Sequence, residues 1–135
     1  MEGSLDTARR FARALDAEDY DCVATCLSST CEYSIRDRIV RGGPAIVANY
    51  REAGAWAASM LESVRYENEV RSAPTGAVIM FLDHLAHHGH TFTHRCEQYL
   101  KFDETGRICR ILHVDLPGER EALAAFLKTP GITRS

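Results

Sequence analysis

The 135-residue sequence carries a formal charge of -3 at pH 7, with its lysine and arginine residues scattered along the chain. This length corresponds to one domain, residues 1–135, with room for one core or cavity. Without a positive patch we expect no nucleic-acid partner, and without an apolar run long enough for a signal or a membrane span we expect a cytoplasmic protein with no membrane partner. The five cysteines are interpreted as buried, reduced thiols.

The N-terminal half reads as three helices. Residues 5–16 place apolar side chains at helical spacing, which predicts an amphipathic helix. A short second helix is expected over residues 20–27, with Asp19 as its N-cap and the following Ser-Ser-Thr as its stop. Residues 31–40 look extended and irregular. Gly42-Gly43-Pro44 then precedes a third helix over residues 45–62, because proline suits a first helical turn.

The C-terminal half reads as strands. Alternating or apolar segments predict strands over residues 63–70, 77–87, 90–102 and 107–115. Pro117 precedes a short C-terminal helix, and Gly131 lies past its end. Helices followed by strands predict an α+β domain, in which about three N-terminal helices cover one face of a curved antiparallel sheet.

This order of elements resembles the nuclear transport factor 2-like superfamily, in its SnoaL-like and ketosteroid isomerase-like branch. The resemblance is carried by RRFARALDAEDYDCVATCL, VRGGPAIVANYREA and YLKFDETGRICRILHVDL. It implies a cone-shaped, strongly curved sheet around one apolar pocket, often in a homodimer. Members of the superfamily include isomerases, cyclases, dehydratases, epoxide hydrolases and modules without catalysis, so the fold does not name a reaction.

Five of the six histidines lie in the segment DHLAHHGHTFTH, residues 83–94. A two-residue turn at His88-Gly89 would pair His87 with His90, and therefore Asp83 with His94. A four-residue loop at residues 103–106 would pair His94 with Asp115 and Cys96 with His113. One face then carries mostly apolar residues and is interpreted as concave: Ile79, Phe81, Leu85, Phe92, Leu100 and Ile111.

A polar row of Asp83, His94 and Asp115 would cross this concave face, with His113 one row further along. A carboxyl in an apolar pocket has a raised pKa, and a histidine between two carboxylates would titrate with them, so we expect acid-base chemistry here. The alternative is a buried ion pair with only a structural role. Asp83, His94, His113 and Asp115 are also the one set that could hold a metal, but we expect none because the clustered histidines diverge.

The opposite face is expected to be convex and to form a homodimer contact. Its predicted residues are Met80, Leu82, His84, Thr91, Thr93, Arg95, Glu97 and Tyr99. In this arrangement His84 points outward, and His87, His88 and His90 decorate the hairpin tip. On the irregular first strand, Glu32 and Ser34 are interpreted as facing inward, with Tyr33 outward.

Comparison within the superfamily limits the mechanism. The positions that resemble the catalytic residues of ketosteroid isomerases hold Phe11, Ser34 and Gln98, so that mechanism is not carried over. Both aspartates of limonene epoxide hydrolases are matched, by Asp83 and Asp115, but their arginine is replaced by Phe81. The segment His113-Val114-Asp115 resembles the His and Asp of SnoaL-type polyketide cyclases.

The sequence therefore predicts a protein that binds a small apolar or cyclic molecule and acts on it without a cofactor, as an isomerase, cyclase or dehydratase. The expected catalytic residues are Asp83, His94, His113 and Asp115. The expected ligand pocket also includes Trp56, although it is interpreted mainly as a packing residue: Phe11, Ser34, Trp56, Phe81, Phe92, Cys96, Gln98 and Ile111. The alternatives are a non-catalytic ligand-binding or dimerisation module and an epoxide hydrolase-like enzyme.

Overall fold

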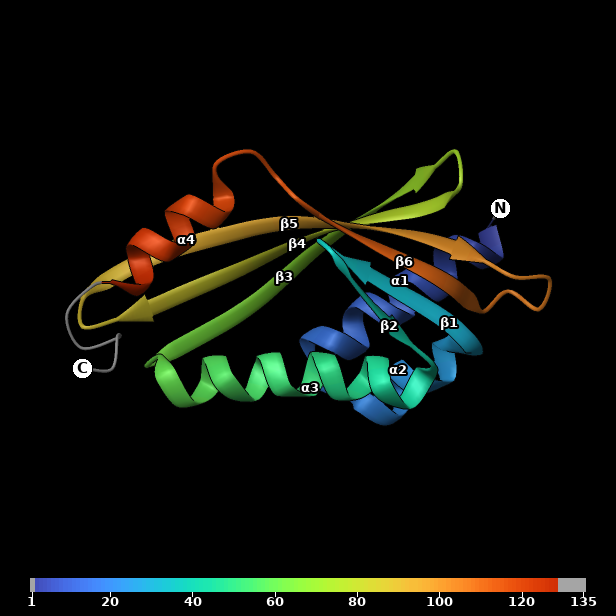
Figure 1. The fold of residues 1–135 in the computed structure, drawn as a ribbon, viewed down its shortest axis with the longest axis horizontal. Helices are drawn as coiled ribbons and strands as arrows, with labels where there is room; N and C mark the ends of the chain where they lie inside the picture. Colours follow the sequence, from blue (N-terminus) through green and yellow to red (C-terminus); the bar gives the residue numbers. More distant parts are fainter. Residues whose placement is uncertain (1, 129–135) are drawn as a thin grey trace.

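The computed structural model describes residues 2–128, which form four helices and one six-stranded sheet (Figure 1). The helices are α1 (Glu2–Asp16), α2 (Tyr20–Cys26), α3 (Gly43–Met60) and α4 (Glu119–Leu127). The strands are β1 (Leu27–Ile35), β2 (Arg38–Arg41), β3 (Ser63–Ala73), β4 (Gly76–His87), β5 (His90–Phe102) and β6 (Ile108–Asp115). No helix among these residues is both long and apolar enough to span a membrane.

Local sequence signals account for most element boundaries. The side chain of Asp19 accepts a hydrogen bond from the Cys22 backbone N–H at 3.2 Å and so caps α2. Pro44 occupies the first turn of α3, which runs through Gly54 to Met60. The expected stop after α2 is wrong, because the chain passes directly from Cys26 into β1. Gly131, expected beyond the last helix, lies outside the described residues.

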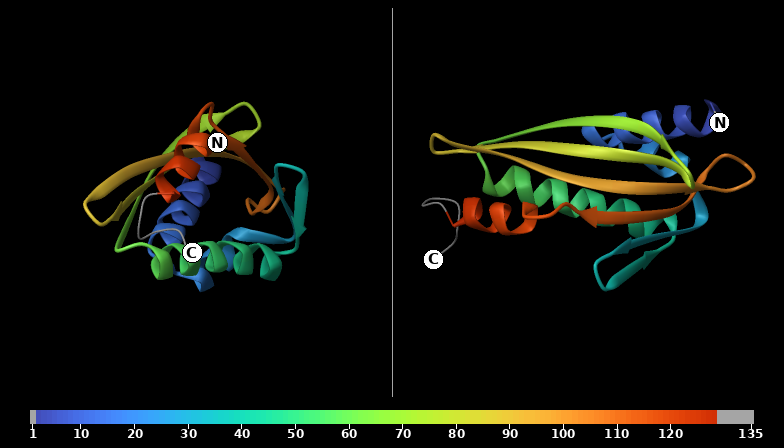
Figure 2. Two further views of the ribbon diagram at one scale, coloured as in Figure 1. Left: turned by 60° about the vertical axis from the view of Figure 1, so that its left-hand side comes forward. Right: turned by 90° about the horizontal axis from the view of Figure 1, so that it is seen from above.

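The strand order in the sheet is β2-β1-β6-β5-β4-β3. The pairing of β1 with β6 is parallel and the other pairings are antiparallel, so the expected antiparallel sheet is in fact mixed. The sheet is unclosed and curves around α1 and α3 (Figure 2). Phe11, fully buried on α1, packs in the core that joins these helices to the sheet.

A smaller apolar cluster closes one end of the cone. Phe126 of α4 packs there with Leu61 and Leu85, and its ring stacks on Phe92 with centroids 5.6 Å apart. In Figure 1, α4 lies at the end of the molecule where α3 finishes and the β4–β5 hairpin turns. The helices and the sheet therefore leave a hollow between them.

Candidate active site

A cavity of about 390 Å³ lies between the helices and the concave face of the sheet. Its walls come from all four described helices and from strands β1 to β6, and most of the lining is apolar or aromatic. Trp56 of α3 belongs to the lining although it is 49% exposed, so it stands where the cavity meets solvent. A space of this size and character suits a small, largely apolar molecule.

Asp83 of β4 is the most perturbed carboxyl of this wall. Burial and, less strongly, the nearby charge of Asp16 raise its pKa to about 6. The charge of His84 has a weaker effect that opposes this rise. Among residues 2–128 no side chain or backbone group hydrogen-bonds to this carboxyl. Burial and the charge of Asp83 raise the pKa of the adjacent Tyr66 to about 12. Asp83 therefore exchanges protons near neutral pH beside a phenol that stays protonated.

Asp16, the last residue of α1, is a second carboxyl group that lines the cavity near Asp83. Its carboxylate accepts a hydrogen bond of 2.6 Å from the side-chain amide of Asn68 on β3. Burial raises the pKa of Asp16, and the bond from Asn68 opposes that rise. Asp16 therefore has a hydrogen-bond donor that favours its charged form, whereas the Asp83 carboxyl has no such donor within residues 2–128.

His94 lines the cavity opposite Asp83 but does not hydrogen-bond to it in the described part of the chain. Its buried Nδ1 has no hydrogen-bond partner within residues 2–128, and a carboxylate oxygen of Glu119 on α4 lies 3.8 Å away. Burial lowers the pKa of His94 more than the charges of Glu119 and Asp115 raise it. His94 is therefore neutral at pH 7.

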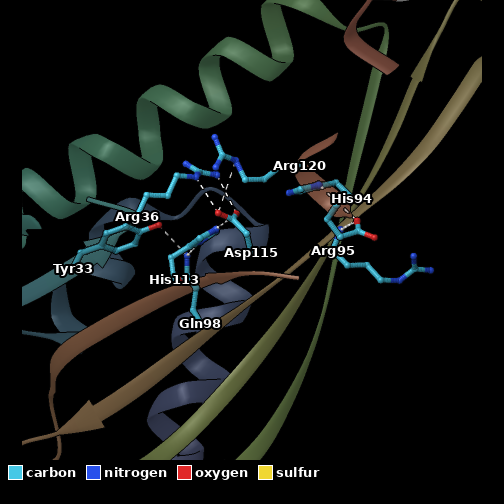
Figure 3. Close-up of polar contacts among 9 residues, drawn as sticks. Tyr33, Arg36, His94, Arg95, Gln98, His113, Asp115 and Arg120 are labelled. Atoms are coloured by element: carbon cyan, nitrogen blue, oxygen red, sulfur yellow. Dashed lines mark hydrogen bonds and ion pairs between the residues drawn. The ribbon is translucent and has the colours of Figure 1, made fainter. Parts of the chain in front are cut away.

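His113 and Asp115 form a second polar group, on β6 (Figure 3). His113 Nε2 lies 3.0 Å from Asp115 Oδ1, and Arg36 holds both carboxylate oxygens of Asp115, at 2.9 and 3.0 Å. Burial alone would raise the pKa of Asp115, but the hydrogen bonds from His113 and Arg36 and their charges lower it. Arg120 approaches the same carboxylate at 4.0 Å. Asp115 is thus held as an ion-paired carboxylate.

Gln98 connects this pair to two tyrosines deep in the cavity. Tyr50 donates a 2.6 Å hydrogen bond to Gln98 Oε1, and Gln98 Nε2 donates to the hydroxyl oxygen of Tyr33 at 3.1 Å. The same nitrogen lies 3.3 Å from His113 Nδ1. Gln98 and Tyr33 are only 3% exposed, so the network is almost completely removed from solvent.

Comparison with solved structures identifies the architecture. An NTF2-like protein of unknown function from Burkholderia pseudomallei is 16% identical, covers 99% of this chain and 100% of its own, and has a TM-score of 0.70. A protein from Shewanella putrefaciens described as a SnoaL-like polyketide cyclase is 15% identical, with coverages of 93% and 98% and a TM-score of 0.68. The chain has the nuclear transport factor 2-like fold.

An LEH-like epoxide hydrolase from M. tuberculosis has the same fold, with 21% identity, coverages of 93% and 96% and a TM-score of 0.62. Neither a protein-family model nor a curated protein matches the sequence. Identities this low establish the nuclear transport factor 2-like fold and leave the reaction to the residues of the cavity.

The predicted β4–β5 register is confirmed. His88 and Gly89 have φ angles of 49° and 80°, as a type I′ turn requires, and Asp83 pairs with His94. The predicted β5–β6 register is wrong by two residues, because the loop is one residue longer than expected and the pairing shifts by one more residue between Lys101 and Phe102. A shift of two keeps the same side chains on the concave face but moves Asp115 from His94 to Cys96.

The structure distributes the expected site residues over the cavity and the core. Asp83, His94 and His113 line the cavity, whereas Asp115 stands behind His113 in its ion pair with Arg36. Of the expected pocket residues, four line it: Trp56, Phe81, Cys96 and Gln98. The other four lie elsewhere: Phe11 and Ile111 in the core, Phe92 against Phe126, and Ser34 between Ile39 and Leu112.

The expected orientation of β1 is also wrong. Tyr33 faces inward and Ser34 does not line the cavity, because the chain follows the apolar alternation of Cys31, Tyr33 and Ile35. The alternation of apolar residues along β1 is visible in the sequence, and it correctly predicts that Tyr33 faces the cavity. No sequence pattern predicted the ion pair of Arg36 with Asp115, because it forms only when the sheet brings β1 beside β6.

No group of three or more His, Cys, Asp or Glu side chains within residues 2–128 is arranged to hold a metal ion. Besides Glu18, Tyr20, Arg38, Asn49 and His94, the polar lining contains two sets of neighbouring side chains. Asp83, Asp16 and Tyr66 form the first, and Tyr33, Tyr50, Gln98 and His113 form the second. The first set offers a proton acceptor, and the second offers hydrogen-bond donors.

Proposed function

We propose that this protein is a cofactor-free enzyme that transfers a proton on a small, largely apolar molecule containing a carbonyl group, with Asp83 as the general base. The observation that carries the proposal is the carboxyl of Asp83, which lies on the cavity wall without a hydrogen-bond partner among the described residues and has a pKa of about 6. General bases work best when their pKa lies near the working pH.

Asp83 fits this role better than Asp115. Arg36 and His113 occupy the carboxylate of Asp115 and lower its pKa, which makes it a weaker base. Asp115 also lies outside the cavity lining, whereas Asp83 belongs to it. The catalytic role expected of Asp115 is therefore replaced by a supporting one, in which it holds His113.

The chemistry needs one carboxyl group. Asp83 takes a proton from the carbon next to the carbonyl, so the C–H bond breaks, an O–H bond forms on Asp83, and the electron pair moves to the carbonyl oxygen. A carboxylic acid with a pKa of about 6 then gives the proton back to the substrate. Return to the same carbon is exchange, return to the γ carbon of a β,γ-unsaturated ketone is an isomerisation, and transfer to a departing β-hydroxyl group, which leaves as water, is a dehydration.

The test is deuterium uptake in D₂O by a bicyclic ketone, 1-decalone, followed by mass spectrometry. We expect the protein to accelerate uptake next to the carbonyl and Asp83→Asn to slow it by about 100-fold or more, since a positioned base contributes roughly 10² to 10⁴. Asp6→Asn is the matched control, because the side chain of Asp6 is 78% exposed. Binding of the ketone without exchange would instead indicate a non-catalytic ligand-binding protein.

A further inference from the structure

The hydrogen-bond network of the cavity wall determines which polar atoms carry hydrogen, starting from Asp115. A carboxylate held by Arg36 can only accept hydrogen bonds, so His113 Nε2, 3.0 Å away, must carry hydrogen. Burial lowers the pKa of His113, which keeps the ring neutral. A neutral imidazole has one N–H, and therefore His113 Nδ1 is an acceptor.

The acceptor at Nδ1 then orients the amide of Gln98. The group 3.3 Å from Nδ1 must be the NH₂ of Gln98, since an oxygen there would leave two acceptors facing each other. The amide oxygen consequently faces Tyr50, at a distance of 2.6 Å that is typical of an O–H···O bond. The second hydrogen of the NH₂ goes to the hydroxyl oxygen of Tyr33, at 3.1 Å.

The hydroxyl of Tyr33 is thus used as an acceptor, and its own hydrogen remains available. Within residues 2–128 the structure shows no acceptor for that hydrogen. Tyr33 lines the cavity and is 3% exposed, so water has little access to the group. Burial also raises the pKa of Tyr33 well above its usual value, which keeps the phenol protonated. Figure 3 shows Tyr33, Gln98 and His113 converging at this place.

We infer that Tyr33 is the hydrogen-bond donor that anchors an uncharged oxygen acceptor of the ligand, such as a ketone carbonyl. This place favours an acceptor, since the Tyr33 hydroxyl has a hydrogen to donate while both hydrogens of the Gln98 NH₂ are already bound. The cavity wall, which is mostly apolar, also favours an uncharged one, because burying a charge there is costly. This role rests on the proposed function and names the ligand group that is bound. Tyr33 binds the ligand, whereas Asp83 transfers the proton.

The experiment compares binding of 1-decalone with that of decalin, which lacks only the carbonyl oxygen. Trp56, the single tryptophan, stands at the cavity and reports binding by its fluorescence. We expect the protein to prefer the ketone and Tyr33→Phe to reduce that preference about 3- to 10-fold, as the loss of one hydrogen bond to an uncharged group predicts. Tyr99→Phe is the matched control, because the hydroxyl of Tyr99 donates to Glu97 outside the cavity.

A second measurement excludes a structural effect of the substitution. The carbonyl stretching frequency of bound, carbon-13-labelled 1-decalone is expected to be lowered by the hydrogen bond and to return toward its value in an apolar solvent in Tyr33→Phe. A protein that binds the ketone no better than decalin, or a Tyr33→Phe variant that keeps both the preference and the frequency, overturns the inference. Asp83→Asn is expected to keep the ketone preference while losing deuterium exchange, so the two proposals fail separately.

Discussion

The charge of Asp83 has a cost that should be measurable in the stability of the protein. The folded chain raises the pKa of this carboxyl from 3.8 to about 6. Between these two values the folded state holds the proton more tightly than the unfolded state, so stability falls as the pH rises through this window. Below about pH 4 the group is protonated in both states and contributes no difference. Above about pH 6 the penalty is fully present.

Asp83→Asn should therefore stabilise the protein at neutral pH. The shift corresponds to about 2 to 3 kcal/mol in the free energy of unfolding above about pH 6, and to no difference at about pH 4. Urea unfolding of the two proteins at both pH values checks this. An equal effect at the two pH values would show that packing rather than charge is responsible. A gain in stability with a loss of activity is typical of substitutions at active sites.

Residue positions were predicted correctly where a tight turn fixes the strand pairing, and wrongly on the irregular β1 and where they depend on neighbours distant in sequence. The pairing of Asp83 with His94 followed from a two-residue turn and is confirmed. Arg36 could not be found as a partner of Asp115 in this way, since it reaches the carboxylate from the turn between β1 and β2, 79 residues earlier in the chain. Asp16 likewise comes to the cavity only through the packing of α1 against the sheet.

Among the elements, the hairpin between β5 and β6 had the greatest effect on the site. Asp103 closes its loop by accepting hydrogen bonds from the backbone N–H groups of Thr105 and Arg107, at 2.9 and 3.1 Å. The loop extends to Arg107, one residue further than expected, and the pairing shifts beside it. Loop length alone could not reveal this shift, because an irregularity in the strand changes register without a sequence signature as strong as that of His88-Gly89.

The turn between β3 and β4 depends on a glycine. Gly76 has a φ of 149°, and a Cβ atom there would collide with the backbone oxygen of Leu100. Gly76→Ala should therefore lower the free energy of unfolding by about 1 to 3 kcal/mol. Gly43→Ala is the matched control, since Gly43 has open space around it and a φ outside the positive range. Denaturant unfolding of the two variants tests this, and equal stabilities would contradict the steric account.

For the whole molecule, the sequence predicted the layers better than the connections. The helices, strands and curved sheet were expected from apolar spacing, whereas the parallel pairing of β1 with β6 was not. The parallel pairing joins residues 78 to 81 positions apart in the sequence, and nothing local to either strand specifies it. That contact places Tyr33 beside Ile111, so it determines which side of the cavity holds the donors.

The convex face of the sheet remains the expected homodimer contact. Leu112, which is 47% exposed, lies on this face in the row that contains Tyr99. A charge at Leu82, as in Leu82→Glu, should separate a dimer into monomers on size-exclusion chromatography, because burying a charge at an apolar contact is costly. Ala55→Glu is the control, since Ala55 is exposed but lies on α3, on the other side of the sheet. An unchanged elution volume for Leu82→Glu would argue against this face.

The central claim is that a desolvated carboxyl, Asp83, moves a proton on a ligand in the cavity. The pH dependence of kcat/KM for deuterium uptake by 1-decalone tests it most directly, since this quantity reports the pKa of the base in the free protein. The account predicts a rate that rises with pH and levels off above about 6, the pKa of Asp83, and that loses this rise in Asp83→Asn. A rise that persists unchanged in Asp83→Asn, or a protein that produces no exchange above the buffer rate, would contradict it.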